Sequence, residues 1–363
     1  MTLKRRVYLA RVIGAAVWAA LRTLIRRARR GPTLPSWTWS EELFVAVSRA
    51  TAMASASDVT LMTPRATGPR APLSRSARAV LTVERVDLLS VKAERYCPKT
   101  TPSGTILWFH GGGFVAGSVG LERRVAAARA AASNCDTYSV DYRLAPQYPF
   151  PAALEDAVLA YRAVLDRGAD PSTTILTGGS AGACLALGTL LKIRELGLPQ
   201  PAGAVLLWPY ADFTFSGETI QTNAEIDMVP IRDLSHVWGP AYVGTADPAD
   251  PLVSPALADL TGLPPLLIIA GGAESLLSCA ERIAANARRD GVDARLTVYP
   301  EKVHGWMILP KLPATTQAIE EIDQWIYDRL DSDHGRPEAS ASVPPPTTPY
   351  ATAETAIVKD SPT

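Results

Sequence analysis

One serine lies in a cluster of small residues that could expose it for nucleophilic chemistry. The motif GGSAG at 178–182 follows the apolar run TTILT and precedes ACLALGTLL, which has helical spacing. Glycine is costly in regular structure, so such a cluster marks a bend that larger side chains would obstruct. A strand, a sharp turn and a helix form the context in which a G-x-S-x-G motif presents its serine, here Ser180, to an acyl carbon. Taken alone, the motif could also be a glycine-rich turn that serves packing or phosphate binding.

A second cluster of glycines lies upstream, at the end of another apolar run, in ILWFHGGGF. Consecutive glycines allow backbone N–H groups to approach a substrate oxygen, as an oxyanion hole requires for charge that develops in a transition state. The residues assigned to this oxyanion hole are Gly111, Gly112, Gly113 and Ala181. The amides of Gly112, Gly113 and Ala181 are the expected donors.

A serine hydroxyl at its free pKa is a poor nucleophile, so it needs a base within hydrogen-bonding distance and a third group that orients the base. The candidate base is His304, which follows the predicted strand ARLTVYP in a loop that could carry it over a sheet edge. The remaining histidines lie in the glycine loop, in a polar insertion and in the C-terminal tail, at His110, His236 and His334. His304 is therefore assigned as the general base.

The third group should be a carboxylate that follows a strand between Ser180 and His304 in the chain. Glu274, in LLIIAGGAESLL, meets this description and would hold the imidazole in the productive tautomer. Asp290 and Asp293, in the turn RRDGVD, are weaker candidates. On its own, Glu274 could also be a solvated loop carboxylate, so its assignment depends on the serine and the histidine.

Elements that could position these residues alternate between about Val83 and Leu330. Short apolar runs typical of buried strands occur at 104–110, 135–142, 173–178, 204–210, 265–271 and 294–300. Helical spacing occurs at 121–132, 153–168, 181–197, 279–291 and 316–330. This alternation predicts an α/β fold with a mainly parallel central sheet flanked by helices on both faces. The polar stretch at about 213–245 does not follow this alternation of strands and helices. It is interpreted as an insertion over the carboxyl edge of the sheet, where ligands bind in this fold class.

Composition divides the chain into three parts. Residues 1–79 form an N-terminal amphipathic helix and a cap-forming segment, residues 80–330 the catalytic domain, and residues 331–363 a tail whose polar, proline-rich composition predicts disorder. The formal net charge of +0 argues against a nucleic-acid partner. The 4 cysteines are widely spaced in apolar contexts, which predicts reduced, packed thiols and neither disulfides nor a metal site.

The N-terminal helix separates its charged and apolar residues. At about 100° per residue, Lys4, Arg11, Arg22 and Arg29 project on one side, and Leu9, Ile13, Val17, Leu21 and Leu24 gather on the opposite side. The uncharged run Val12–Leu21 is about half as long as a bilayer-crossing helix requires, and Arg11 interrupts the core that a secretory signal needs. Two interpretations remain open: a peripheral membrane contact through residues 1–30 on an anionic surface, or packing on the protein's own body. We favour the second, with a cytoplasmic location.

Together these motifs resemble the hormone-sensitive-lipase-like branch of the α/β-hydrolase esterases. The resemblance is carried by HGGGF at 110–114, DYRLAPQYPFPAALEDA at 141–157, GGSAG at 178–182, AESLL at 273–277 and HGW at 304–306. It implies an α/β-hydrolase core with a helical cap built partly from N-terminal segments. It also implies a serine carboxylesterase that hydrolyses short- to medium-chain acyl esters, small-molecule substrates, without a cofactor. Acetyl-hydrolase and lactone-hydrolase members look most similar, so acetyl esters or lactones are candidate substrates.

Three positions depart from the pattern of this family. The family usually carries Asp where this chain has Gly179, Gly where it has Ala183, and an Asp-Pro acid motif where it has Glu274-Ser275. Loss of the acidic residue beside the serine removes a supporting polar group. A catalytically weak α/β-hydrolase that acts as a small-ligand-binding protein is therefore the alternative to an active esterase.

Overall fold

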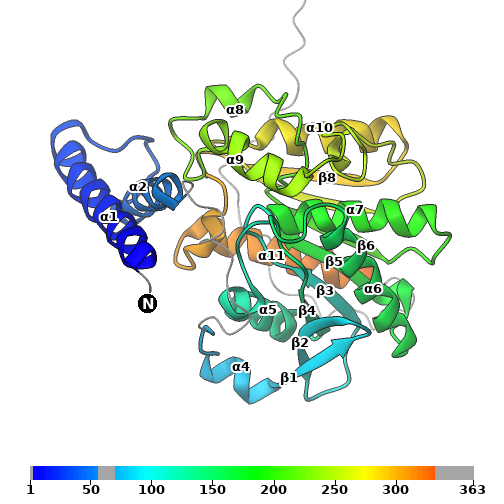
Figure 1. The fold of residues 1–363 in the computed structure, drawn as a ribbon. Helices are drawn as coiled ribbons and strands as arrows, with labels where there is room; N and C mark the ends of the chain where they lie inside the picture. Colours follow the sequence, from blue (N-terminus) through cyan, green and yellow to red (C-terminus); the bar gives the residue numbers. More distant parts are fainter. Residues whose placement is uncertain (1–2, 56–69, 332–363) are drawn as a thin grey trace, which may run out of the picture. The chain divides into compact units, whose positions relative to one another are not determined.

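The computed structural model describes residues 3–55 and 70–331, which contain one eight-stranded sheet (Figure 1). Its strands are β1 (Leu81–Leu88), β2 (Val91–Pro98), β3 (Thr105–Phe109), β4 (Asp136–Asp141), β5 (Thr174–Gly179), β6 (Gly203–Leu207), β7 (Leu266–Gly271) and β8 (Ala294–Tyr299). The spatial order is β1-β2-β4-β3-β5-β6-β7-β8, and β3 to β8 run parallel. Every strand predicted from an apolar run is present, so the α/β prediction is confirmed.

β1 and β2, which were not predicted from sequence, form an antiparallel hairpin at one end of the sheet. The short helix α4 (Arg75–Val80) leads into β1. Apolar and charged residues mix along LTVERVDL, and much of β1 is exposed. A hairpin with one solvated face needs only such a half-buried pattern. It therefore lacks the continuous apolar run by which the buried strands were recognised.

Helices cover both faces of the sheet and build two cores. One face carries α5 (Val119–Ser133) and α11 (Pro313–Leu330), and the other carries α6 (Ala152–Asp166), α7 (Ala181–Glu195) and α10 (Leu277–Arg289). Successive side chains of a strand point to opposite faces. Ile106 and Trp108 of β3 accordingly join the core with α5, and Leu107 and Phe109 join the core with α7. All these helices occur where helical spacing predicted them, apart from their end residues.

The polar insertion between β6 and β7 contains two short helices, α8 (Thr219–Thr222) and α9 (Ile231–Val243). α9 packs on the loop after β3. The ring of Tyr242 stacks on that of Phe114 with centroids 3.7 Å apart, and the indole of Trp238 lies against Gly113. The insertion therefore contacts the carboxyl edge of the sheet, as its position in the sequence predicted. Short 3-10 helices occur at η1 (Pro171–Thr173), η2 (Pro255–Leu257) and η3 (Trp306–Ile308).

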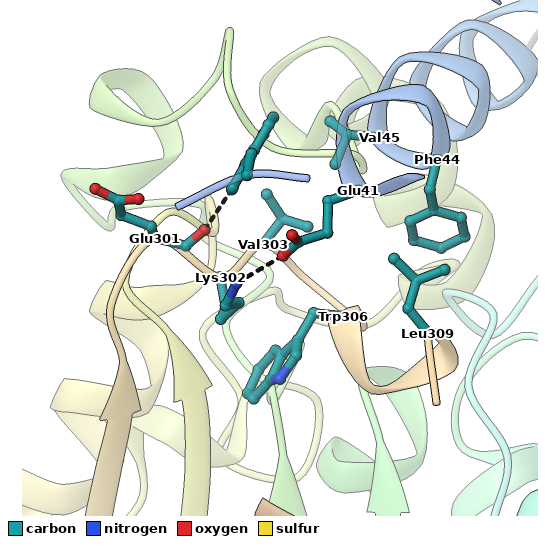
Figure 2. Close-up of a pocket in the computed structure, with 9 residues that line it drawn as sticks. Glu41, Phe44, Val45, Glu301, Lys302, Val303, Trp306 and Leu309 are labelled. Atoms are coloured by element: carbon teal, nitrogen blue, oxygen red, sulfur yellow. Dashed lines mark hydrogen bonds and ion pairs between the residues drawn. The ribbon is translucent and has the colours of Figure 1, made fainter. Parts of the chain in front are cut away.

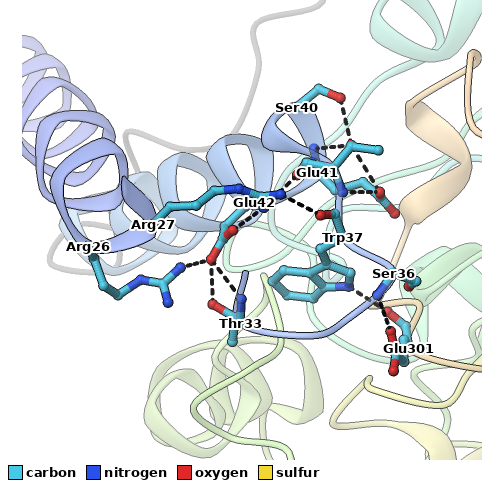
Figure 3. A network of polar contacts seen from close by, with 10 residues as sticks. Arg26, Arg27, Thr33, Ser36, Trp37, Ser40, Glu41, Glu42 and Glu301 are labelled. Atoms are coloured by element: carbon cyan, nitrogen blue, oxygen red, sulfur yellow. Dashed lines mark hydrogen bonds and ion pairs between the residues drawn. The ribbon is translucent and has the colours of Figure 1, made fainter. Parts of the chain in front are cut away.

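The first two helices of the described chain, α1 (Leu3–Arg30) and α2 (Trp39–Ser55), pack along each other (Figure 1). The buried carboxylate of Glu42 joins them, because it pairs with Arg26 and Arg27 and accepts hydrogen bonds from Thr33 (Figure 3). One face of α1 thus packs on α2, whereas its apolar side chains at Leu9, Ile13, Val17, Leu21 and Leu24 are exposed. The two interpretations given above both stay predictions.

α1 differs from the sequence expectation in its capacity to span a bilayer. The segment Arg6–Arg30 contains an 18-residue stretch with a mean hydropathy of 1.4, and it is long and apolar enough to cross a membrane by length and composition alone. The uncharged run Val12–Leu21 is too short to span a bilayer, but it is only part of the apolar segment. In the structure the helix continues unbroken through Arg11 and Arg22.

The remaining composition-based expectations concern the tail and the thiols. The tail at 331–363 lies outside the described residues, apart from Asp331. The cysteines are free, and Cys135, Cys184 and Cys279 are buried as predicted, whereas Cys97 is only partly buried.

Candidate active site

Ser180 lies at the sharp turn between β5 and α7, at the carboxyl edge of the sheet. Its backbone has φ 58° and ψ −118°, a conformation that non-glycine residues rarely adopt. A Cβ on Gly178 would lie 2.5 Å from the carbonyl oxygen of Phe109, and a Cβ on Gly182 would lie 2.0 Å from the same oxygen. The glycines on both sides of the motif are therefore required, because the turn backs directly onto the end of β3.

His304 reaches Ser180 from the loop after β8. Its Nε2 lies 2.9 Å from the serine Oγ, a hydrogen-bonding distance, and its ring is buried. Glu301 and Gly305, with φ values of 57° and 69°, let the loop turn over the sheet edge. The structure thus brings together the serine and the histidine that were selected from sequence.

Glu274 approaches the other ring nitrogen of His304. Its Oε2 lies 3.3 Å from Nδ1, and its Oε1 accepts a 3.1 Å hydrogen bond from the amide of Gly271 at the end of β7. Within the described residues, neither Oε2 of Glu274 nor Nδ1 of His304 makes a hydrogen bond to another group, so the contact between these two atoms has no competing partner. Asp290 and Asp293, the weaker candidates, make their polar contacts with other residues.

Burial favours the neutral forms of His304 and Glu274. Desolvation lowers the pKa of His304 below its ordinary value of 6.5 and raises the pKa of Glu274 above its ordinary value of 4.5. A neutral imidazole is the form that can accept a proton from a hydroxyl. Once the imidazole is protonated, the adjacent buried carboxylate is placed to stabilise its charge. The arrangement can therefore move a proton away from the Oγ of Ser180.

The loop after β3 brings its glycine amides to the same edge. Gly112 and Gly113 have φ values of 124° and 61°, and a Cβ on either would collide with a neighbour. Within the part of the chain that is described, the amides of Gly112, Gly113 and Ala181 donate to no other group. The amide of Gly111 instead donates a 2.7 Å hydrogen bond to Oε1 of Glu122. This corrects the assignment of Gly111, because its N–H is already committed to a carboxylate and is not available to an oxyanion.

Glu122, in the first turn of α5, holds the glycine loop in place. Its second carboxylate oxygen accepts a 2.8 Å hydrogen bond from the indole N–H of Trp108 on β3. Elsewhere on the loop, the hydroxyl of Tyr142 donates to the carbonyl of His110 at 2.7 Å, and the two rings stack. Burial raises the pKa of Glu122. Glu122 was not predicted from sequence, because a carboxylate in the first turn of a helix is ordinary and belongs to no motif.

Asp227, between α8 and α9, connects the two loops that carry Glu274 and His304. One of its carboxylate oxygens accepts the amide of His304 at 3.0 Å, and the other accepts the amide of Ser275 at 2.7 Å. Its own carbonyl accepts a hydrogen bond of 3.0 Å from Arg49 of α2. The side chain is fully buried, and desolvation raises its pKa to about 6. Asp227 was not predicted from sequence either, since only the folded chain brings its partners together.

The N-terminal segment supports the loop that precedes His304 (Figure 2). The ammonium of Lys302 pairs with the carboxylate of Glu41 at 2.6 Å. The carbonyl of Glu301 accepts the indole N–H of Trp37 at 2.7 Å. α2 and the residues just before it are therefore anchored directly to the segment that positions the imidazole.

Trp208 occupies the space that a side chain at Gly179 would fill. A Cβ on Gly179 would lie 2.9 Å from the indole Nε1 of Trp208. The same indole stands edge-on to the imidazole of His304, with ring centroids 6.3 Å apart. The glycine beside the serine, which departs from the family's pattern, is therefore matched by a bulky neighbour.

Comparison with known proteins places this site in a family. A model of the alpha/beta hydrolase fold matches residues 106–308. An acetyl-hydrolase of Streptomyces hygroscopicus is 39% identical over 233 residues, which cover 63% of this chain and 77% of that protein. An esterase of Acinetobacter venetianus is 29% identical over 245 residues, which cover 67% of this chain and 81% of that protein.

Solved structures extend the similarity to most of the chain. An esterase from the bacterial hormone-sensitive lipase (HSL) family matches with a TM-score of 0.68 and 34% identity, covering 89% of this chain and 98% of that one. A hormone-sensitive lipase from a metagenome library matches with a TM-score of 0.67 and 33% identity, covering 87% and 98%. The chain therefore belongs to the alpha/beta hydrolase family, as a carboxylic ester hydrolase of its hormone-sensitive-lipase-like branch.

Proposed function

We propose that the chain hydrolyses esters by acyl transfer through Ser180, His304 and Glu274. The Oγ of Ser180 forms a bond to the ester carbonyl carbon while its proton passes to Nε2 of His304, which then gives that proton to the departing alcohol. Water, deprotonated by the same Nε2, attacks the acyl-enzyme and releases the carboxylic acid and the free serine. Glu274 orients the imidazole and stabilises its protonated form.

One observation carries this proposal: the contacts run in series from the serine to the buried carboxylate. The Oγ and Nε2 atoms are 2.9 Å apart, and Nδ1 and Oε2 are 3.3 Å apart. Because the pKa of His304 is lowered, the imidazole is neutral and able to accept a proton near pH 7. Because Glu274 has few other polar partners, its pairing with the imidazolium strengthens as the proton is transferred.

The oxyanion of the tetrahedral intermediate is assigned to the amides of Gly112, Gly113 and Ala181. Ala181 is the first residue of α7, so its N–H also lies at the positive end of the helix dipole. Removing one donor of this kind typically costs about 3–4 kcal/mol of transition-state stabilisation. The contacts of Glu122 and Trp238 with the loop keep these amides in place before substrate arrives.

The substrates proposed are esters with short- to medium-chain acyl groups, with acetyl esters first. Support for acetyl esters comes from the acetyl-hydrolase that is 39% identical to this chain. Lactones present the same carbonyl carbon to the serine and are included. The cap over this site is assigned to the described part of the N-terminal segment, residues 3–55 and 70–79, and to the insertion at about 213–245. Arg49 of α2 supports this by contacting Asp233 of α9 at 3.4 Å.

The test is covalent labelling combined with turnover. The purified protein is treated with a fluorophosphonate, the labelled peptide is identified by mass spectrometry, and p-nitrophenyl esters from acetate to laurate are assayed in parallel. We expect label on Ser180, with loss of label and turnover in Ser180→Ala. Both should be retained in Ser133→Ala, a serine of α5 whose hydroxyl donates to the carbonyl of Arg129 in the same helix. Turnover that persists in Ser180→Ala contradicts the mechanism. Absence of label and turnover in the native protein would favour a ligand-binding role.

A further inference from the structure

α1 carries two faces with different surroundings. The face against α2 contains the buried Thr23 and the two arginines that pair with Glu42. The opposite face is apolar and open along the helix, with its large exposed side chains at Val7, Leu9, Ile13, Val17, Trp18, Leu21, Leu24 and Ile25. Trp18 is 68% exposed. Solvent does not favour so long a row of apolar side chains, so this exposed face indicates an interaction surface.

Charge identifies the chemistry of the partner. Between Leu3 and Arg30 the helix contains no acidic residue, and its sequence is rich in arginine although the whole chain has a net charge of +0. At about 100° per residue, Arg11, Arg22 and Arg29 form a strip along one border of the exposed apolar face, and all three are exposed. An apolar face with a basic border matches a surface that is apolar inside and anionic outside.

We propose that α1 docks the protein on an anionic phospholipid membrane and lies in the plane of its surface. The apolar side chains named above enter the boundary between headgroups and acyl chains, while Arg11, Arg22 and Arg29 contact lipid phosphates. Trp18, the most exposed of the apolar residues, is of the type that prefers this boundary. α2 couples the docked helix to the catalytic body through the pair between Glu41 and Lys302.

A second copy of the chain fits this face less well. Two α1 helices packed through their apolar faces would bring arginine strips together, and α1 offers no carboxylate to neutralise them. A membrane-spanning orientation also fits less well, although the segment is long enough by composition. Spanning would draw Arg11 and Arg22 into hydrocarbon and separate α1 from the α2 surface on which it packs.

The experiment is flotation of the full chain with vesicles of phosphatidylcholine, with and without phosphatidylglycerol. We expect binding to the anionic vesicles that weakens at high salt. The test variant Val17→Gln/Leu21→Gln should lose binding at least about tenfold. Its matched control is Val125→Gln/Leu196→Gln on the catalytic body, where the side chains are 47% and 49% exposed, against 54% and 50% in α1. The control should bind like the native chain.

Further measurements separate docking from misfolding and from the other arrangements. Turnover of a water-soluble ester should be unchanged in both double variants, which reports an intact body independently of lipid. The variant Arg11→Gln/Arg22→Gln/Arg29→Gln should bind anionic vesicles at least about tenfold less tightly. No binding by the native chain, or equal binding by both double variants, overturns the proposal. Resistance to alkaline extraction from membranes would indicate that α1 spans the bilayer. A dimer that dissociates only in the variant Val17→Gln/Leu21→Gln would assign the apolar face to a second copy of the chain. Either result also overturns the proposal.

Discussion

Replacing Asp227 by Asn tests whether the imidazole depends on a residue that contacts neither Ser180 nor the substrate carbonyl in the proposed mechanism. The carboxylate accepts the amides of His304 and Ser275 at 3.0 and 2.7 Å, and so fixes the loops that supply the base and its acid partner. Asn has the same shape, but its NH₂ group would face one of two N–H donors. At least one of these hydrogen bonds is therefore lost, and a buried donor is left unsatisfied.

The magnitude follows from the kind of hydrogen bond that is broken. A hydrogen bond to a charged group contributes about 1.5–3 kcal/mol. At about 1.4 kcal/mol for each tenfold change in rate, a loss expressed wholly in the transition state lowers kcat roughly 10- to 100-fold. KM should change less, because Asp227 lies behind the loops and is fully buried. The unsatisfied amide should also lower the free energy of unfolding by about 1–3 kcal/mol.

The assay compares kcat and KM for p-nitrophenyl acetate with the rate of fluorophosphonate inactivation, at temperatures well below thermal unfolding. Both kcat and the inactivation rate should fall together, because both report attack by Ser180. Asp233→Asn is the matched control, since Asp233 also contacts Arg49 but neither of the two loops. If Asp227→Asn retains the native kcat, or if Asp233→Asn loses as much activity, the positioning role assigned to Asp227 is wrong.

Three further predictions concern other parts of the site. Glu122→Gln offers one oxygen to two N–H donors, so even if that oxygen keeps the amide of Gly111, the bond becomes neutral and the indole N–H of Trp108 is left unpaired. The value of kcat for p-nitrophenyl acetate should then fall by at least about 3- to 10-fold; native kcat would refute this. Gly179→Ala places a Cβ against Trp208 and should lower the free energy of unfolding by about 1–3 kcal/mol in denaturant titrations. The loss of unfolding free energy caused by Gly179→Ala should be smaller in a Trp208→Ala background. An equal loss in both backgrounds would show that the indole is not the obstacle. Because desolvation lowers the pKa of His304 and the base must be neutral, the acid limb of the kcat/KM profile should lie below pH 6.5, and a limb above that value would contradict the burial argument.

The parts of the site that could be predicted from sequence are those whose physical cause is local. Gly178 and Gly182 are close in sequence to Ser180, and the steric conflict that they avoid arises in the turn itself. Glu274 follows the buried strand β7 and His304 follows β8, the partly exposed strand at the end of the sheet. Because β7 and β8 are parallel, both residues come to the same edge. Periodicity and turn composition were sufficient for these residues.

Residues that act through backbone amides could not be found in this way. Asp227 binds the amides of Ser275 and His304, and Glu122 binds the amide of Gly111, so neither leaves a pattern of residue types in the sequence. Every residue except proline has a backbone N–H group, so residue types do not show which amides these carboxylates bind. The partners are identified only when the positions of the loops are known. The error over Gly111 has the same origin, because its spacing matches an oxyanion donor but its amide is already occupied.

Gly179 lacks the acidic side chain that the family usually carries at this position, but in the structure the indole of Trp208 occupies the space of the missing side chain. An acidic residue at this position would have added a polar contact beside the serine, and its absence raised the alternative of a catalytically weak protein. In the structure, the indole of Trp208 approaches to 2.9 Å from the site of the missing Cβ and also stands beside His304. A residue with a side chain at 179 would displace that indole from the imidazole. Gly179 is therefore compatible with a packed site, and placing Asp at this position alone should displace the indole of Trp208 and damage the site.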